Sequence, residues 1–263
     1  MSQIFRVESW TELQEKLFFD TWDDKIQRHR SSYIYRGMDD ANSTLLTSLA
    51  RLGGPFEKLE RHLIRNFRKY AHSNDIQGDS LWNWLAVAQH HGLPTRLLDW
   101  TYSPYVALHF ATQNLESYDS DGVIWGLNYT ALNQVLPASM KKVIEREESN
   151  TFTADMLNSV CGNLDELQAL EEEEFLVFLE PPSLDNRIVN QYALFSLLSN
   201  SHTLMDDFLE KHSEFYFKIV FPGELKWEIR DKLDQANITE RVLYPGLDGL
   251  SQWLKRHYSQ REK

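Results

Sequence analysis

Apolar and polar positions along this chain follow helical spacing in some segments and strand-like runs in others. Apolar residues recur with a helical period over residues 10–22, and Ser9 and Glu12 form a capping-box pattern at the start of that run. We therefore predict an N-terminal helical segment within residues 1–30. A short strand is expected next, over residues 31–35.

The next part of the chain carries clear start and stop signals. A helix over residues 81–91 is predicted to end there because Gly92 accepts a left-handed cap and a proline stands two residues later. Residues 95–101 are then expected to be extended, and a proline begins a further helix over residues 104–111. The compact apolar run at residues 122–127 predicts a buried strand.

Residues 138–170 combine helical spacing with high charge and are predicted to form a helical insertion or cap over the sheet. The last third of the chain is richer in strands. Strands are expected at residues 175–179, 194–198, 215–221 and 241–244, with helices near 223–236 and after the glycine turn at 245–249. The elements together predict one α+β domain over residues 1–263, with a mixed and mainly antiparallel sheet and flanking helices.

Composition narrows the choice of function. The chain has 263 residues, of which 42% are hydrophobic, and a formal net charge of -12 that disfavours a general polyanion-binding surface. The single Cys161 excludes an internal disulfide and a multi-cysteine zinc site, and it fits a reducing compartment. No apolar run approaches the ~18 residues of a membrane span. We therefore expect a cytoplasmic protein that makes no membrane contact.

A long helix that ends near residue 70 carries a basic face. Arg61, Arg65 and Arg68 lie on that face at helical spacing. Charge on an amphipathic helix usually faces water, so a solvated face is the first interpretation. Contact with a phosphate-bearing ligand is the alternative.

Three further arginines stand at the edges of predicted elements, where a permanent charge needs a partner. Arg36 lies beside Gly37, which lets a ligand approach the backbone, and its guanidinium fork suits a pyrophosphate or a carboxylate. Arg96 is expected to pair with Asp99 or another acid as an internal clamp. Arg187 is the third.

Several common chemistries lack their motifs in this sequence. There is no Walker-type phosphate loop, no Gly-x-Gly-x-x-Gly and no Gly-x-Ser-x-Gly elbow. His90 and His91 are adjacent on a predicted helix and diverge by about 100°, so they cannot share one metal ion. We predict no metal site, and we expect a histidine here to bond a carboxylate such as Asp99 instead.

The motifs together resemble those of the FRG domain family, which is named for a Phe/Tyr-Arg-Gly motif. The matching pieces are Tyr35-Arg36-Gly37, residues 89–101 and 103–111, then Arg187 with Gln191 and Phe195, and finally residues 243–250. This resemblance implies little about activity. Family members are mostly bacterial or phage-borne proteins of undefined role.

The order of parts is also similar to that of mono-ADP-ribosyltransferases. That resemblance implies an NAD substrate with no metal, an acceptor that is a protein or a nucleic acid, and an ADP-ribosyltransferase-like core. Arg36 would hold the phosphates or ribose of NAD, and Thr101 would take the Ser/Thr position before a helix. The residues expected around the ligand are Arg36, Gly37, Gln89, His90, Thr95, Asp99, Thr101 and Arg187.

The third part of that pattern departs from the resemblance. Gln191 is expected to open a late strand where the superfamily has an acid, and an amide cannot stabilise positive charge as a carboxylate does. Glu180, at the end of the preceding strand, is the substitute candidate. A surface residue before two prolines is the favoured alternative, because most glutamates are exposed.

Two hypotheses follow. The first is an ADP-ribosyltransferase-like or NAD-consuming effector, such as a toxin in bacterial defence or phage conflict, with Glu180 or Gln191 as the catalytic group. The second is a non-catalytic module that binds a nucleotide or a protein partner, in which the motif residues are structural.

Overall fold

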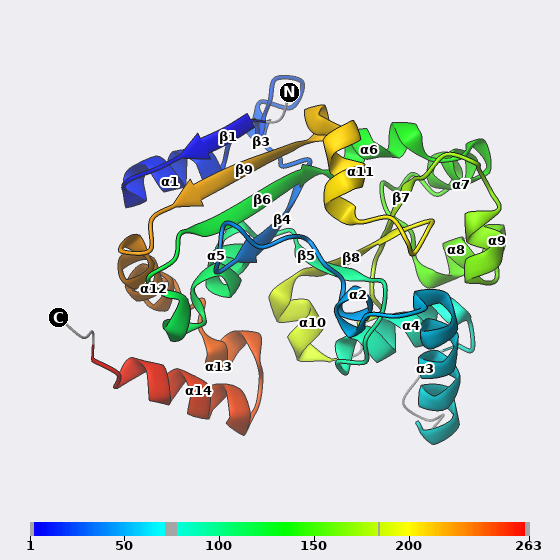
Figure 1. Ribbon diagram of the computed structural model, residues 1–263. Helices are drawn as coiled ribbons and strands as arrows, with labels where there is room; N and C mark the ends of the chain where they lie inside the picture. The colour runs from blue at the N-terminus through cyan, green and yellow to red at the C-terminus, as the bar shows by residue number, and fades with distance from the viewer. Residues whose placement is uncertain (1–2, 72–77, 184, 261–263) are drawn as a thin grey trace.

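A mixed seven-stranded sheet crosses the protein (Figure 1). The computed structural model describes residues 3–71, 78–183 and 185–260. The sheet order is β1-β9-β6-β4-β5-β8-β7, in which β1 and β9 are parallel and all the other neighbours are antiparallel. The strands are β1 (Gln3–Arg6), β4 (Tyr33–Met38), β5 (Leu98–Thr101), β6 (Gly122–Asn128), β7 (Leu176–Leu179), β8 (Ala193–Leu198) and β9 (Tyr216–Phe221). The predicted α+β class and mainly antiparallel sheet are confirmed.

The sheet has two parts that meet at a single residue pair. Strand β4 pairs with β6 along its whole length, and β5 pairs with β8 along its whole length. Between β4 and β5, however, only Tyr35 and Thr101 are paired. One part consists of the four strands β1, β9, β6 and β4, and the other consists of the three strands β5, β8 and β7. The two parts therefore diverge on one side of this pair.

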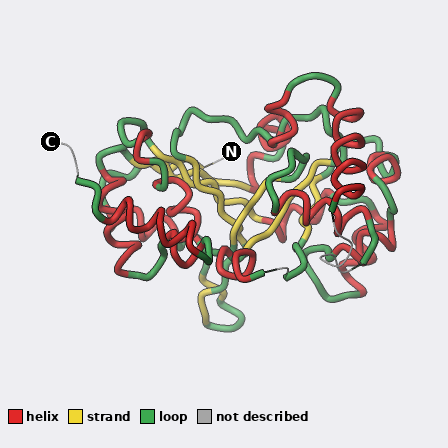
Figure 2. Tube along the Cα trace, turned by 90° about the horizontal axis from the view of Figure 1, so that it is seen from below, coloured by secondary structure: helices red, strands yellow, loops and turns green. Residues whose placement is uncertain are grey.

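Helices cover the two parts of the sheet separately (Figure 2). One apolar cluster joins α1 (Trp10–Leu17), α5 (Pro104–Thr112) and α12 (Leu225–Gln235) to the four-stranded part. A second cluster joins α3 (Phe56–Tyr70), α4 (Leu81–His90) and the 138–170 segment to β7 and β8. A third lies beneath α11 (Met205–Lys211) and includes residues of both parts of the sheet, such as Ile34 of β4 and Trp100 of β5. Each part of the sheet thus has its own helical layer on one face, and the third cluster joins the two parts on the other.

The predicted helical segment at residues 138–170 is confirmed. It forms α7 (Ala138–Arg146), α8 (Ala154–Val160) and α9 (Leu164–Gln168). Met140 and Leu157 are fully buried in the cluster that also contains Trp82 of α4. The segment therefore packs beside the three-stranded part of the sheet (Figure 1).

The helix predicted from residue 10 is present as α1, but it ends at Leu17, and residues 3–30 also hold β1 and a small hairpin of β2 (Trp22–Asp23) and β3 (Arg28–His29), so this segment is not one helix. Two local predictions were wrong. Arg36 and Gly37 lie inside β4, because that strand continues beyond residue 35 to pair with β6. Residues 241–244, expected as a strand, belong to the helix α13 (Glu240–Leu243) and its cap.

A buried charge network fixes the last helices. Arg256 of α14 (Leu247–His257) donates from Nε to Glu240 Oε1 at 2.6 Å and from Nη2 to Asp234 Oδ1 at 2.6 Å. Arg230, which has no exposed surface, reaches Glu240 and also donates from Nη1 to His109 Nδ1 at 2.8 Å. Since buried charges need partners, this network ties α12, α13 and α14 to α5.

Within the part of the chain that the structure describes, no helix combines the length and the apolar character that crossing a bilayer requires.

Candidate functional site

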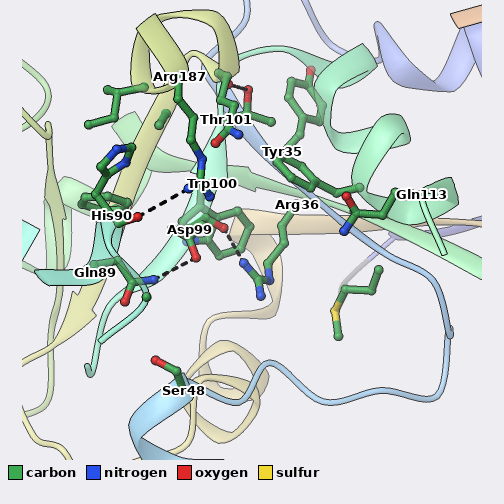
Figure 3. A pocket seen from close by; sticks show the side chains of 18 of the residues that line it. Tyr35, Arg36, Ser48, Gln89, His90, Asp99, Trp100, Thr101, Gln113 and Arg187 are labelled. Carbon is green, nitrogen blue, oxygen red and sulfur yellow. Dashed lines mark hydrogen bonds between the residues drawn. The ribbon is translucent and has the colours of Figure 1, made fainter. Parts of the chain in front are cut away.

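A cavity of about 500 Å³ lies where β4 and β5 part (Figure 3). Its walls come from β4, β5, the end of α4, α2 (Ser48–Leu52) and α10 (Asn186–Gln191). Eight of the ten predicted site residues line it: Arg36, Gly37, Gln89, His90, Asp99, Thr101, Arg187 and Gln191. The structure therefore brings together residues from three distant stretches of the sequence.

The Arg36 side chain projects from β4 into this cavity and has no carboxylate partner in the part of the chain that the structure describes. Its Nη1 donates to the main-chain oxygen of Asp99 at 2.6 Å, and its Nε is buried with no hydrogen-bond partner among the described residues. Burial lowers the pKa of Arg36; the Asp99 carboxylate opposes this effect, and Arg51 across the cavity adds to it. Two guanidinium groups thus face the same space.

A hydrogen-bonded chain holds Asp99 on the opposite strand. Gln89 Nε2 donates to Asp99 Oδ2 at 2.9 Å, and Thr95 Oγ1 donates to Gln89 Oε1 at 2.6 Å. Thr95 Oγ1 also accepts the Leu97 amide at 3.1 Å. Thr95 is fully buried behind the cavity wall and does not line it. It acts on the site through Gln89.

A second set of polar residues, His90, Asp185 and Arg187, joins the end of α4 to the start of α10 beside the cavity. His90 Nε2 bonds Asp185 Oδ2 at 2.8 Å, so the expected bond to a carboxylate is present, with Asp185 in place of Asp99. Asp185 caps α10 by accepting from the backbone amides of Arg187 and Ile188. Arg187 then reaches the His90 carbonyl at 3.5 Å, and its guanidinium lies 5.2 Å from the ring centre of Tyr244. Its Nε has no hydrogen-bond partner in the described structure.

Thr101 and Gln191 are bonded to the protein itself. Thr101 Oγ1 donates to the Gln191 carbonyl at 2.7 Å and accepts the Ser103 amide at 3.0 Å. Gln191 is the last residue of α10 and does not open a strand, since β8 begins two residues later. Its side-chain Nε2 donates to the Leu243 carbonyl at 3.0 Å. Both side chains therefore join α10 to its neighbours.

Glu180 is not brought to the cavity. It follows the end of β7, where its carboxylate accepts a hydrogen bond from Thr151. Burial, followed by the charge of Glu180, raises the pKa of Tyr102 nearby. Its catalytic role stays a prediction that this placement does not support.

Arg96 forms the internal clamp that was predicted, with Glu60 as the acid. Arg96 Nε and Nη2 both donate to Glu60, at 2.8 Å and 2.6 Å to Oε2, and both side chains are buried. On the basic face of α3, Arg61 pairs with Asp165 and Arg68 with Asp79. These exposed pairs agree with a solvated face and contribute little stability.

Sequence reasoning missed Arg51 and Tyr244 as parts of the site. Arg51 stands in α2, a short helix capped by Thr47, and lines the cavity opposite β4. The Tyr244 hydroxyl donates to Gln113 Oε1 at 3.2 Å, and Gln113 lines the cavity. The sequence around Arg51 carries no motif that marks it as a site residue. Tyr244, by contrast, belongs to a motif that had been singled out.

Comparison with known proteins identifies one family. Residues 31–120 match the family model of the FRG domain, so the resemblance is confirmed and an FRG domain is present in that part of the chain. No curated protein and no solved structure matches the chain. The matched residues include Arg36, Gln89 and Asp99, whereas Arg187 and Gln191 lie beyond them.

Proposed function

We propose that the FRG domain of this chain binds NAD or a closely similar dinucleotide in the cavity between β4 and β5, and that the protein cleaves NAD in the manner of an ADP-ribosyltransferase or NAD glycohydrolase. A protein or a nucleic acid would be the acceptor in the first case, and water in the second. The finding that supports this proposal most is the state of Arg36.

The Arg36 guanidinium carries hydrogen-bond donors that are not used within the described structure. It meets a backbone carbonyl and no carboxylate at ion-pair distance among the described residues, and Arg51 faces the same space. A pyrophosphate would accept from the free donors and relieve the repulsion between two like charges. The net charge of -12 makes this local concentration of arginine more selective, because the rest of the molecule repels anions.

The cavity also suits the size and the mixed polarity of a dinucleotide. About 500 Å³ is within the range of ligand pockets. Trp100 and Phe110 supply aromatic wall, and Ser43, Ser48 and Gln113 supply hydrogen-bonding groups. Placing the phosphates at Arg36 and Arg51 leaves the Arg187 side for a second polar part of the ligand.

Replacing Arg36 with alanine is expected to weaken NAD binding about 100-fold and to abolish nicotinamide release. The loss of a charge-assisted contact of about 3 kcal/mol corresponds to that factor. Isothermal titration calorimetry measures the affinity, and chromatography measures nicotinamide. Arg146→Ala is the matched control, because Arg146 is exposed and pairs with its neighbour Glu147 in the helical segment. A wild-type protein that neither binds nor consumes NAD would refute the proposal.

A non-catalytic nucleotide-binding module is the second candidate. The bonded state of Thr101 and Gln191 favours it, because these two predicted site groups hold α10 in place and leave little freedom to act on a ligand. This candidate predicts NAD binding that depends on Arg36 without any release of nicotinamide.

A further inference from the structure

We infer that Asp99 is the catalytic carboxylate of this cavity and that Gln89 and Thr95 are its positioning residues. This inference rests on the proposed cleavage of NAD. It replaces Glu180 and Gln191 as the groups expected to act on the substrate.

Asp99 is the carboxylate whose placement fits the role. It lines the cavity from β5, and its side chain is exposed to that space although its neighbours Leu98 and Trp100 are buried. One carboxylate oxygen, Oδ2, is held by Gln89, and Oδ1 has no hydrogen-bond partner within the described ranges. The main-chain oxygen of Asp99 accepts a hydrogen bond from Arg36 Nη1 at 2.6 Å. The phosphate anchor and the free carboxylate oxygen are thus fixed to the same residue.

The other acids near the cavity are committed elsewhere. Asp39 Oδ2 accepts from Ser117 Oγ at 2.8 Å and from Asn114 Nδ2 at 3.1 Å, which turns its carboxylate toward the short turn that follows α5. Glu180 bonds Thr151 and does not line the cavity. Asp185 is the cap of α10 and partner of His90. Asp39 also lines the cavity, but its carboxylate is turned toward Ser117 and Asn114, whereas Asp99 is the acid among these four whose main chain holds Arg36.

The chain from Thr95 to Asp99 has one possible direction. The Asp99 carboxylate accepts, so the Gln89 NH₂ group faces Asp99, and the carbonyl oxygen of the Gln89 side chain is left to accept from Thr95 Oγ1. This arrangement holds the Asp99 carboxylate in one orientation, because the Gln89 amide donates to Oδ2. Thr95 is fully buried, so its own bond to Gln89 lies behind the cavity wall, whereas the bond from Gln89 to Asp99 faces the cavity.

The chemistry requires only water in addition to NAD. When the bond between C1′ of the ribose and the nicotinamide nitrogen breaks, nicotinamide leaves with the bonding electron pair, and C1′ gains positive charge. The carboxylate of Asp99 would stabilise that charge and accept the proton of the water that bonds C1′. The products are ADP-ribose, nicotinamide and one proton, which passes from Asp99 to solvent. If an acceptor hydroxyl or amine replaces water, it loses its proton in the same way.

Asp99→Asn is the direct test. We expect NAD affinity within about threefold of wild type and a fall in kcat of about 10²- to 10⁴-fold, the usual range for loss of an acid–base group. Asp99→Glu keeps the carboxylate and is expected to retain measurable turnover. Glu180→Gln is the matched control and should leave kcat unchanged. Circular dichroism melts report whether each variant is folded.

The positioning residues have a separate signature. Thr95→Val is expected to lower kcat about tenfold with little change in KM, because the ligand contacts stay while Gln89 is free to turn. Thr95→Ser restores the hydroxyl and should restore kcat. Loss of packing alone would not be rescued selectively by a hydroxyl in the smaller side chain.

These experiments distinguish failure of the role of Asp99 from failure of the proposed NAD cleavage. Wild-type protein that does not bind NAD refutes both. Nicotinamide release that depends on Arg36 but persists at full rate in Asp99→Asn overturns the role of Asp99 and leaves the proposed function intact. NAD binding without any nicotinamide release by wild type also overturns the inference and identifies a binding module. Turnover lost in Asp99→Asn, with binding retained, supports it.

Discussion

Acidification from pH 7 to pH 4 is expected to lower the free energy of unfolding by about 3 kcal/mol through His109 alone. Burial, followed by the charge of Arg230, lowers the pKa of His109 to about 3 from its ordinary 6.5. Below pH 6.5, His109 therefore takes up a proton in the unfolded chain but stays neutral in the folded protein. The stabilisation is fully present above pH 6.5 and is lost as the pH falls toward 3.

Glu240 adds to the same trend at lower pH. Burial opposes ionisation of its carboxyl group, but the hydrogen bonds from Arg256 and the charge of Arg230 outweigh it and lower the pKa to about 2. A depressed acid stabilises the fold above its unfolded pKa, here 4.5, and loses that contribution as the pH falls toward 2. His109 and Glu240 thus make the C-terminal helices sensitive to acid over adjoining pH ranges.

His109→Gln separates the two groups. Glutamine does not titrate, and its side-chain oxygen can accept from Arg230 as His109 Nδ1 does. Urea unfolding at pH 7 and pH 4 should show a loss for this variant about 3 kcal/mol smaller than for wild type. Equal losses in the two proteins would mean that His109 takes up its proton in the folded state.

Gly37→Ala is expected to destabilise the protein by about 3 kcal/mol, the upper part of the range for overpacking. A Cβ atom at residue 37 would lie 1.8 Å from the carbonyl oxygen of Ala107 and 2.9 Å from the amide nitrogen of Ala111. Both atoms belong to the backbone of α5, which cannot turn aside as a flexible side chain can. Helix α5 would have to move away from β4, and the cavity wall would move with it.

Gly162→Ala is the matched control for this substitution. Its new Cβ would meet only the Glu166 carboxylate, at the ordinary contact distance of 3.5 Å. Thermal unfolding should show a much lower Tm for Gly37→Ala and a nearly unchanged Tm for Gly162→Ala. A wild-type Tm for Gly37→Ala would show that α5 is not held as close to β4 as the structure has it.

Local signals in the sequence predicted many of the elements correctly. Gly92 ends α4, Pro104 begins α5, and the apolar run at residues 122–127 is β6. Each of these follows from residues that act on their own backbone, through a left-handed glycine, a fixed proline φ or continuous burial. The same kind of reasoning assigned Gly37 to ligand approach, whereas its small size is used by a helix that lies 70 residues away in the sequence.

Features that depend on contacts between distant parts of the chain could not be predicted from the sequence. Residues 241–244 have strand-like composition, yet they form a helix and its cap because Glu240 must reach Arg256 and Arg230. Glu60 is one of several charged residues in α3 and stands beside Arg61, so nothing local marks it as the buried partner of Arg96. The eight predicted site residues in the cavity were found as motifs, but their separation into ligand-facing and bonded groups came only with the structure.

The single pair between Tyr35 and Thr101 bears on which piece of this chain can fold by itself. Of the described strands of the large sheet, the FRG match at residues 31–120 contains β4 and β5. The strands that satisfy their other backbone groups, β6 and β8, follow later in the chain. A polypeptide cut to the matched region would expose two strand edges and hold them together at one point, so we expect it to aggregate. The autonomous folding unit must therefore extend at least through β9, far beyond the family signature.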